Sequence, residues 1–167
     1  RPCDHCKKDF YPLRMGQKAC SNRCAIAVVK ANKKAERAND KVRKEKLKSP
    51  KQWKKEALAV FCDWIRRRDE DRPCISCGRM DAGQWHAGHY RDTFHYSSLA
   101  FDESNCHKQC AQCNAPPPLG MGGNLINYRL GLVARIGMVR VSELEQTQPP
   151  KKWSIEELKA IKEKYRA

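Results

Sequence analysis

Four pairs of closely spaced cysteines are the residues in this 167-residue chain whose chemistry is easiest to define. Close thiolate pairs separated by loops are the usual pattern of tetrahedral zinc sites, in which two pairs complete one site. The alternative interpretation, free thiols in a small core, leaves the regular spacing unexplained. The two predicted zinc sites consist of Cys3, Cys6, Cys20 and Cys24, and of Cys74, Cys77, Cys110 and Cys113.

Histidines and asparagines accompany the second set of cysteines. Residues 86–89 read His-Ala-Gly-His, Asn105 precedes the last cysteine pair, and Asn114 follows it directly. A zinc ion held by four cysteines needs no imidazole, whereas phosphodiester hydrolysis needs a neutral imidazole that takes a proton from water. It also needs a hard divalent cation on the phosphate, which prefers oxygen donors such as the asparagine side chain. The pattern therefore indicates hydrolysis of a phosphodiester.

The charge of the chain favours a polyanionic partner. Lys and Arg number 34 against 19 Asp and Glu, a formal net charge of +15. Nucleic acid and an anionic membrane surface are the two candidates. No apolar run approaches the roughly 18 residues that a membrane span needs, and no signal peptide is visible. We therefore expect nucleic acid as partner, no membrane, and reduced, metal-bound thiols in a cytoplasm.

A long basic helix is expected at residues 27–49, a stretch without Gly or Pro. Twelve basic and three acidic residues lie between Lys30 and Lys55. Such a run is often only a solvated face, but charge of one sign destabilises a helix unless phosphates neutralise it. The residues predicted to contact DNA are Lys33, Lys34, Arg37, Lys41, Arg43 and Lys44 of this helix, together with Arg91.

Further helices are expected on both sides of the second cysteine set. Ser49 and Pro50 fit the N-cap and first position of a helix over 51–68, in which apolar residues recur at helical spacing. Residues 115–123 are rich in Pro and Gly and cannot be helical. The remaining predicted helices are 124–136, 142–145 and one that begins with a capping box of Ser154 and Glu157.

This chain resembles the NinG (Rap) family of lambdoid phages in five segments: PCISCG, QWHAGHYR, NCHKQCAQCN, GGNLINYRLGLVARIG and WSIEELKAIKEKY. The spacing of cysteine pairs, histidine and asparagines also resembles the HNH, or ββα-metal, nuclease motif and the zinc-flanked layout of phage resolving endonuclease VII. The resemblance implies an α+β, mostly helical fold with an HNH (His-Me finger) core stapled by a four-cysteine zinc site. The implied domains are an N-terminal four-cysteine zinc finger (1–26), a long basic helix (27–49) and the nuclease domain (50–167).

The resemblance also implies roles for single residues. His89 would be the general base, and Asn105 would orient it and hold the hairpin. Asn114 would bind the catalytic Mg²⁺ or Mn²⁺ together with His86, which stands where relatives of this kind place an aspartate. An imidazole binds Mn²⁺ better than Mg²⁺, so the cation stays open. Asn124 is a second candidate for the metal, because the proline loop prevents a helix from starting after Asn114.

The implied function is that of a metal-dependent, structure-specific endonuclease acting on Holliday junctions, D-loops or other branched intermediates of phage recombination. It would work in the cytoplasm of a bacterial host. Symmetrical cutting of a four-way junction needs two active sites, so a homodimer is expected, joined through residues 27–49 or 53–65. Two alternatives stay open: a non-catalytic zinc-finger DNA-binding protein, and a sequence-specific HNH nuclease.

Overall fold

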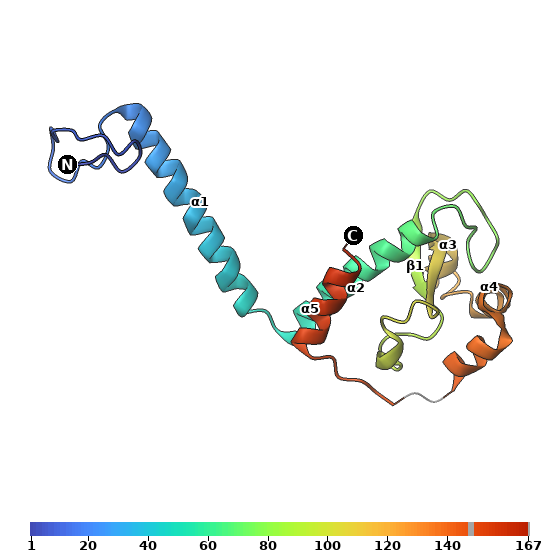
Figure 1. Ribbon diagram of the computed structural model, residues 1–167. Coiled ribbons are helices and arrows are strands. Elements are labelled where there is room, and N and C mark those ends of the chain that lie inside the picture. Colours follow the sequence, from blue (N-terminus) through green and yellow to red (C-terminus); the bar gives the residue numbers. More distant parts are fainter. Residues whose placement is uncertain (147–148, 167) are drawn as a thin grey trace. The chain divides into compact units, whose positions relative to one another are not determined.

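A computed structural model describes residues 1–146 and 149–166 and divides the chain into two compact units, Arg1–Lys48 and Ser49–Ala167 (Figure 1). The fold combines helices with one small two-stranded sheet, so the expected mixture of helix and strand is confirmed. Among the described residues, every helix is too short or too polar to cross a lipid bilayer.

The first unit contains a cysteine-rich loop region followed by helix α1 (Asn22–Lys46). The helix begins five residues before the expected position 27, because the Ser21 side chain accepts a hydrogen bond from the N–H of Cys24 and caps it. Cys24 therefore lies in the first turn, and the cysteine region and the helix overlap. Cys24 is also the buried residue of α1, so this helix presents most of its surface to solvent.

The second unit starts with helix α2 (Pro50–Arg68), which confirms the helix predicted there. Ser49 and Gln52 form a reciprocal capping box, and Pro50 occupies the first turn, where its missing N–H costs nothing. One face of the helix is apolar at a spacing of four residues, which places it against the core. Its buried residues are Trp53, Ala57, Phe61 and Ile65.

Helix α5 (Ile155–Lys164) packs along α2, and Figure 1 shows the two lying side by side. The predicted capping box of Ser154 and Glu157 is confirmed. Tyr165, which ends the helix, places its ring 5.0 Å from that of Phe61 in an edge-to-face arrangement. The pair of helices forms a platform for one face of the sheet.

The sheet is an antiparallel hairpin of β1 (Trp85–His89) and β2 (Cys106–Cys110). In its register His86 stands opposite Gln109, and Gly88 stands opposite His107. Successive side chains of a strand point to opposite faces. The face carrying Ala87 and Cys106 packs on the core formed by α2 and α5. A single helical turn, α3 (Ala111–Asn114), follows β2 directly.

Helix α4 (Leu125–Glu145) packs on Ile75 and Leu99, in the loops beside the hairpin, and reaches the other face of the hairpin through Tyr128. Its fully buried Tyr128 donates a hydrogen bond to the carbonyl of Gly88 at 2.7 Å. Gly137, at φ +81°, divides α4 into two helical pieces, so the prediction of two helices here is confirmed although the second begins earlier. Residues 115–123 are non-helical, as predicted.

A buried carboxylate ties α2 to the hairpin. Asp69, fully buried at the end of α2, accepts hydrogen bonds from the Nε and Nη2 atoms of Arg68 at 2.9 and 2.8 Å. It also accepts one from the backbone N–H of Lys108 in β2 at 3.0 Å, and Arg135 of α4 lies 3.5 Å away. The end of α2, strand β2 and helix α4 therefore all contact the Asp69 carboxylate.

We expect Asp69→Asn to lower the free energy of unfolding by about 3–5 kcal/mol at pH 7, because it leaves the partly buried guanidinium groups of Arg68 and Arg135 without their charged partner. Burial raises the pKa of Asp69, but the hydrogen bonds from Arg68 and Lys108 outweigh it, so the folded-state pKa lies below the usual value. This stabilisation is present above the unfolded-state pKa of about 4 and is lost as pH falls. Urea unfolding of wild type and Asp69→Asn at several pH values measures it. A difference that stays constant from pH 7 to pH 3 would contradict the assignment.

Candidate metal and nucleic-acid site

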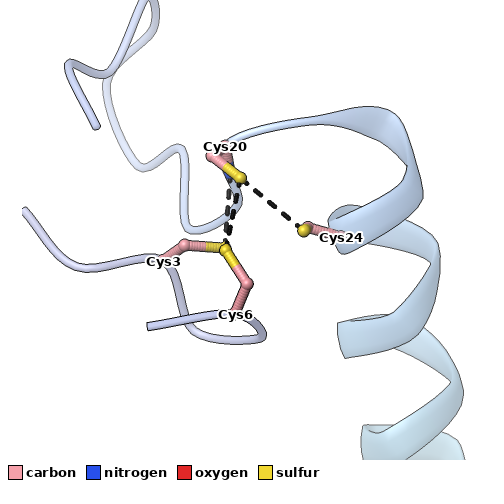
Figure 2. Close-up of side chains that lie close together, drawn as sticks. All are labelled: Cys3, Cys6, Cys20 and Cys24. Atoms are coloured by element: carbon pink, nitrogen blue, oxygen red, sulfur yellow. Dashed lines mark hydrogen bonds between the residues drawn. The ribbon is translucent and has the colours of Figure 1, made fainter. Parts of the chain in front are cut away.

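The N-terminal cysteines converge on one point. Figure 2 shows the four side chains turned toward one another, and their sulfur atoms all lie within 4.8 Å of one another. The Sγ atom of Cys20 is 3.6 Å from that of Cys6 and 3.6 Å from that of Cys24. A tetrahedral zinc ion with Zn–S bonds of about 2.3 Å separates its sulfur ligands by about 3.8 Å. The cluster of Cys3, Cys6, Cys20 and Cys24 therefore has the dimensions of a zinc site.

The second cysteine cluster joins the loop after α2 to the end of the hairpin. The Sγ atoms of Cys77 and Cys110 are 3.8 Å apart, and all four sulfurs lie within 4.8 Å of one another. The N–H of Cys110 donates to the sulfur of Cys74 at 3.3 Å. Burial raises the pKa of Cys74, but this and other backbone N–H donors lower it to about 7. Both predicted cysteine sets could thus hold zinc.

Asn124 belongs to the surroundings of this cluster. Its Nδ2 donates to the sulfur of Cys113 at 3.4 Å, and its Oδ1 accepts from Asn127 at 2.9 Å. An amide that donates to a thiolate offsets part of the charge that a metal-bound sulfur carries. The Asn124 side chain therefore contacts the cysteine cluster, whereas Asn114 is the asparagine that contacts His86.

His86 and Asn114 lie together. The cysteine cluster anchors α3 against β1, so that the Nδ2 atom of Asn114 is 2.9 Å from the Nδ1 atom of His86. A Cβ atom on Gly88 would stand 3.1 Å from the Oδ1 atom of Asn114 and 2.2 Å from the Oε1 atom of Gln109. A side chain at position 88 would collide with the Gln109 oxygen, so glycine here lets both amide oxygens lie close to β1.

Gln109 is a candidate that the sequence reasoning missed. Its side chain is 1% exposed, and its Nε2 donates to the Oγ of Ser76 at 2.7 Å and to the carbonyl of Gly123 at 2.6 Å. Its Oε1 has no hydrogen-bond partner among the described residues. A buried acceptor without a partner costs about 1–3 kcal/mol, so this oxygen is available as a ligand. The hairpin register, which sets Gln109 opposite His86, is the signal that identifies it.

His89 points to the other side of the hairpin from His86. Its Nε2 is 3.2 Å from the carbonyl oxygen of Ala100, and its Nδ1 is 3.7 Å from the sulfur of Cys106. Burial lowers the pKa of His89, which keeps the imidazole neutral at pH 7. Because a carbonyl only accepts, Nε2 carries the proton and the bare Nδ1 faces the thiol. His89 and Asn114 nevertheless line the same groove, whereas His86 is not part of its lining.

Asn105 holds the loop that connects the two strands. Its fully buried side chain accepts from the N–H of Arg91 at 2.8 Å and donates to the carbonyls of Arg91 at 2.9 Å and Leu99 at 3.1 Å. The residue after Leu99 is Ala100, whose carbonyl meets His89. Asn105 thereby positions both ends of the loop and, through it, the histidine.

A groove of about 390 Å³ runs between this loop and the loop after α3. Arg91 contributes a positive charge, with its guanidinium 3.9 Å above the ring of Tyr96, and its Nε is buried without a hydrogen-bond partner among the described residues. A phosphate would supply such a partner. The residues lining the groove are His89, Tyr90, Arg91, Asp92, Tyr96, Asn114, Pro116, Gly122, Gly123 and Leu125.

A further imidazole stands near the groove. The Nδ1 atom of His95 is 3.0 Å from each carboxylate oxygen of Asp92, and the His95 side chain is 71% exposed. The carboxylate therefore holds the ring at Nδ1, and Nε2 is the nitrogen that it does not contact.

The predicted DNA contacts on α1 are all exposed. They lie in the first unit, along a helix whose charged side chains are free to meet phosphates. These residues are Lys33, Lys34, Arg37, Lys41, Arg43 and Lys44.

A family model described as "Bacteriophage Lambda NinG protein" matches residues 1–167, the full length of the chain. The chain belongs to the NinG family. It is 39% identical over 181 residues to protein ninG of Escherichia phage lambda and of Salmonella phage P22, covering 97% of this chain and 87% of each relative. Protein ninG of Escherichia phage 933W is 38% identical over 184 residues, covering 99% of this chain and 90% of the relative. No solved structure matches.

Both cysteine clusters, α1 and the hairpin lie within the part that matches the NinG family. The name NinG states no activity.

Proposed function

We propose that this chain is a metal-dependent endonuclease that cuts branched DNA such as Holliday junctions and D-loops. One observation carries the proposal. His86, Asn114 and the Gln109 oxygen, which has no hydrogen-bond partner among the residues that the structure describes, lie close to Gly88 and next to a groove that contains Arg91. One imidazole and two amide oxygens suit a hard or borderline divalent cation, in a hairpin that a thiolate-bound zinc ion would clamp.

The catalytic cation we propose is Mn²⁺ or Mg²⁺, held by His86 and Asn114, with Gln109 as a third ligand. The Asn114 amide donates to the Nδ1 atom of His86, so it would have to turn its oxygen toward the ion when this nitrogen binds the metal. Bound there, such an ion would neutralise charge on the phosphate and on the leaving oxygen. The Arg91 guanidinium would bind a neighbouring phosphate oxygen and hold the strand in the groove. Two zinc ions in the cysteine clusters are structural in this proposal.

The general base we propose is His89, whose neutral ring has the protonation state that the role requires. For its Nδ1 to reach water, the ring must turn away from Cys106, and DNA binding in the groove would have to supply that rearrangement. His95 is the second candidate, because Asp92 fixes its tautomer and its ring is exposed.

DNA binding would rest on phosphate contacts. The exposed basic side chains of α1 and the net charge of +15 favour recognition of the backbone rather than of base sequence. The preference for branched DNA is inferred from the resemblance to resolving nucleases. A homodimer would supply the two active sites that paired cuts require.

A cleavage assay tests the proposal. A four-way junction and a linear duplex of the same arm sequence are incubated with zinc-loaded protein in Mg²⁺ or Mn²⁺. We expect cutting of the junction by wild type and a loss of about 10²–10⁴-fold in the variant that removes the base. His89→Gln keeps a donor for the Ala100 carbonyl but cannot take a proton at pH 7, and His95→Gln is the parallel variant. Zinc content and circular dichroism verify that both variants fold.

Three results would contradict parts of this proposal. DNA binding without cutting of any branched substrate would favour a non-catalytic zinc-finger protein. Cutting of the linear duplex at one sequence would favour a site-specific HNH nuclease. Full activity of His89→Gln together with inactivity of His95→Gln would move the role of base to His95.

A further inference from the structure

Phe94 is exposed beside the groove although it is large and apolar. Its side chain is 86% exposed, and it lies in the turn that follows β1. A single exposed apolar residue is common on protein surfaces and is not by itself a site. Two features distinguish Phe94 from such residues: the hydrogen-bonded turn that holds its ring, and the position of that turn beside the groove.

The turn is built to hold Phe94 in place. The Oδ1 atom of Asp92 accepts from the N–H of Phe94 at 3.0 Å and from the N–H of His95 at 2.9 Å. The N–H of Tyr96 donates to the carbonyl of Asp92 at 3.0 Å, which closes the turn. The His95 ring meets the Phe94 ring edge to face at 5.0 Å. A ring supported in this way loses little conformational entropy when it binds.

The location of the turn points to nucleic acid. Asp92 and Tyr96, on either side of Phe94, both line the groove, and so does Arg91. The ring that contacts Phe94 is that of His95, a polar side chain. A protein partner needs several hundred Å² of complementary surface, whereas an unstacked base needs one aromatic face.

We infer that Phe94 stacks on an unpaired or weakly stacked base at a DNA branch point and thereby selects branched over linear duplex. The inference rests on the proposed function, and it deepens it by naming a residue for substrate selection. Bases at a branch point have lost part of their stacking, so the ring enters there at a lower cost than in a continuous duplex.

Binding experiments without added Mg²⁺ or Mn²⁺, in which no strand is cut, test this inference. A four-way junction carrying 2-aminopurine next to the branch reports unstacking as increased fluorescence. We expect wild type to raise the fluorescence, and Phe94→Ala to abolish the rise and weaken junction binding about ten-fold. Phe94→Trp keeps an aromatic face for stacking, so it should retain both the rise in fluorescence and the affinity for the junction. Ile126→Ala removes another exposed apolar side chain (82% exposed) of the second unit and should behave as wild type.

The affinity for linear duplex should be the same in all four proteins. Equal junction affinity and equal fluorescence for wild type and Phe94→Ala would overturn the inference, while junction cutting by both would leave the proposed function standing. A change in sedimentation of Phe94→Ala with unchanged fluorescence would show that the ring contacts a protein and would also overturn it. Failure of wild type to bind any DNA would overturn both.

Discussion

Replacing Asn114 with alanine is expected to reduce cleavage of branched DNA by about 1000-fold or more, while folding and DNA binding persist. The Asn114 amide lies 2.9 Å from the ring of His86, and its oxygen lies close to β1 at Gly88. Its loss would remove an oxygen ligand from a cation that has few protein ligands. Initial cleavage rates on a four-way junction in Mn²⁺ measure the effect, and gel-shift affinity verifies binding.

Asn127→Ala is the matched control, because this exposed asparagine lies in α4 and contacts Asn124 rather than His86. It should cut at the wild-type rate. The companion variant His86→Asp exchanges an imidazole for a carboxylate, which Mg²⁺ accepts more readily. We expect its activity in Mg²⁺ to rise relative to that in Mn²⁺. Wild-type cutting by Asn114→Ala would exclude Asn114 as a ligand of the catalytic cation.

Disruption of the zinc site proposed at the second cysteine cluster is the second large effect. Cys110→Ser is expected to lower the zinc content from two ions to one and to unfold the hairpin, because zinc contributes about 10–16 kcal/mol of apparent binding energy to small sites of this kind. Cys110 ends β2, and its sulfur lies 3.8 Å from that of Cys77. Zinc analysis and hydrogen exchange of the hairpin amides measure the change.

Cys6→Ser in the other cluster is the control. It should also lose one zinc ion, but the hairpin lies in the other unit and should keep its exchange protection. We expect this variant to bind DNA more weakly and to keep the same ratio of Mn²⁺ to Mg²⁺ activity. If Cys110→Ser kept full protection of the β1 and β2 amides, the cluster would not be what holds the hairpin together.

Local signals in the sequence predicted much of the fold. Ser49 and Ser154 each accept a hydrogen bond from a backbone N–H in the first turn of their helix. Their capping boxes can therefore be identified without knowledge of the rest of the chain. The cysteine spacings predicted both clusters for the same reason, because each pair brings two sulfurs together locally. Ser21 gave a comparable signal for the start of α1 that the sequence reasoning overlooked.

The candidate site depends on tertiary structure that the spacing of residues does not reveal. His86 and His89 are three residues apart, which in a strand places them on opposite faces, and of the two only His89 lines the groove together with Asn114. Gln109 joins the site through the register of the hairpin, and Asn124 leaves it because its amide meets Cys113. The place of Gln109 depends on which residues pair across the sheet, and that of Asn124 depends on how the chain after α3 returns to the cysteine cluster.

Pulsed electron paramagnetic resonance of Mn²⁺ added to zinc-loaded protein with a four-way junction tests most directly whether a second, non-zinc cation occupies the space beside Gly88. We predict a nitrogen coupling from the imidazole of His86 that is present in wild type, absent in His86→Asp and retained in His95→Gln. A Mn²⁺ spectrum without nitrogen coupling in wild type, or one that His86→Asp leaves unchanged, would contradict a catalytic cation bound by His86.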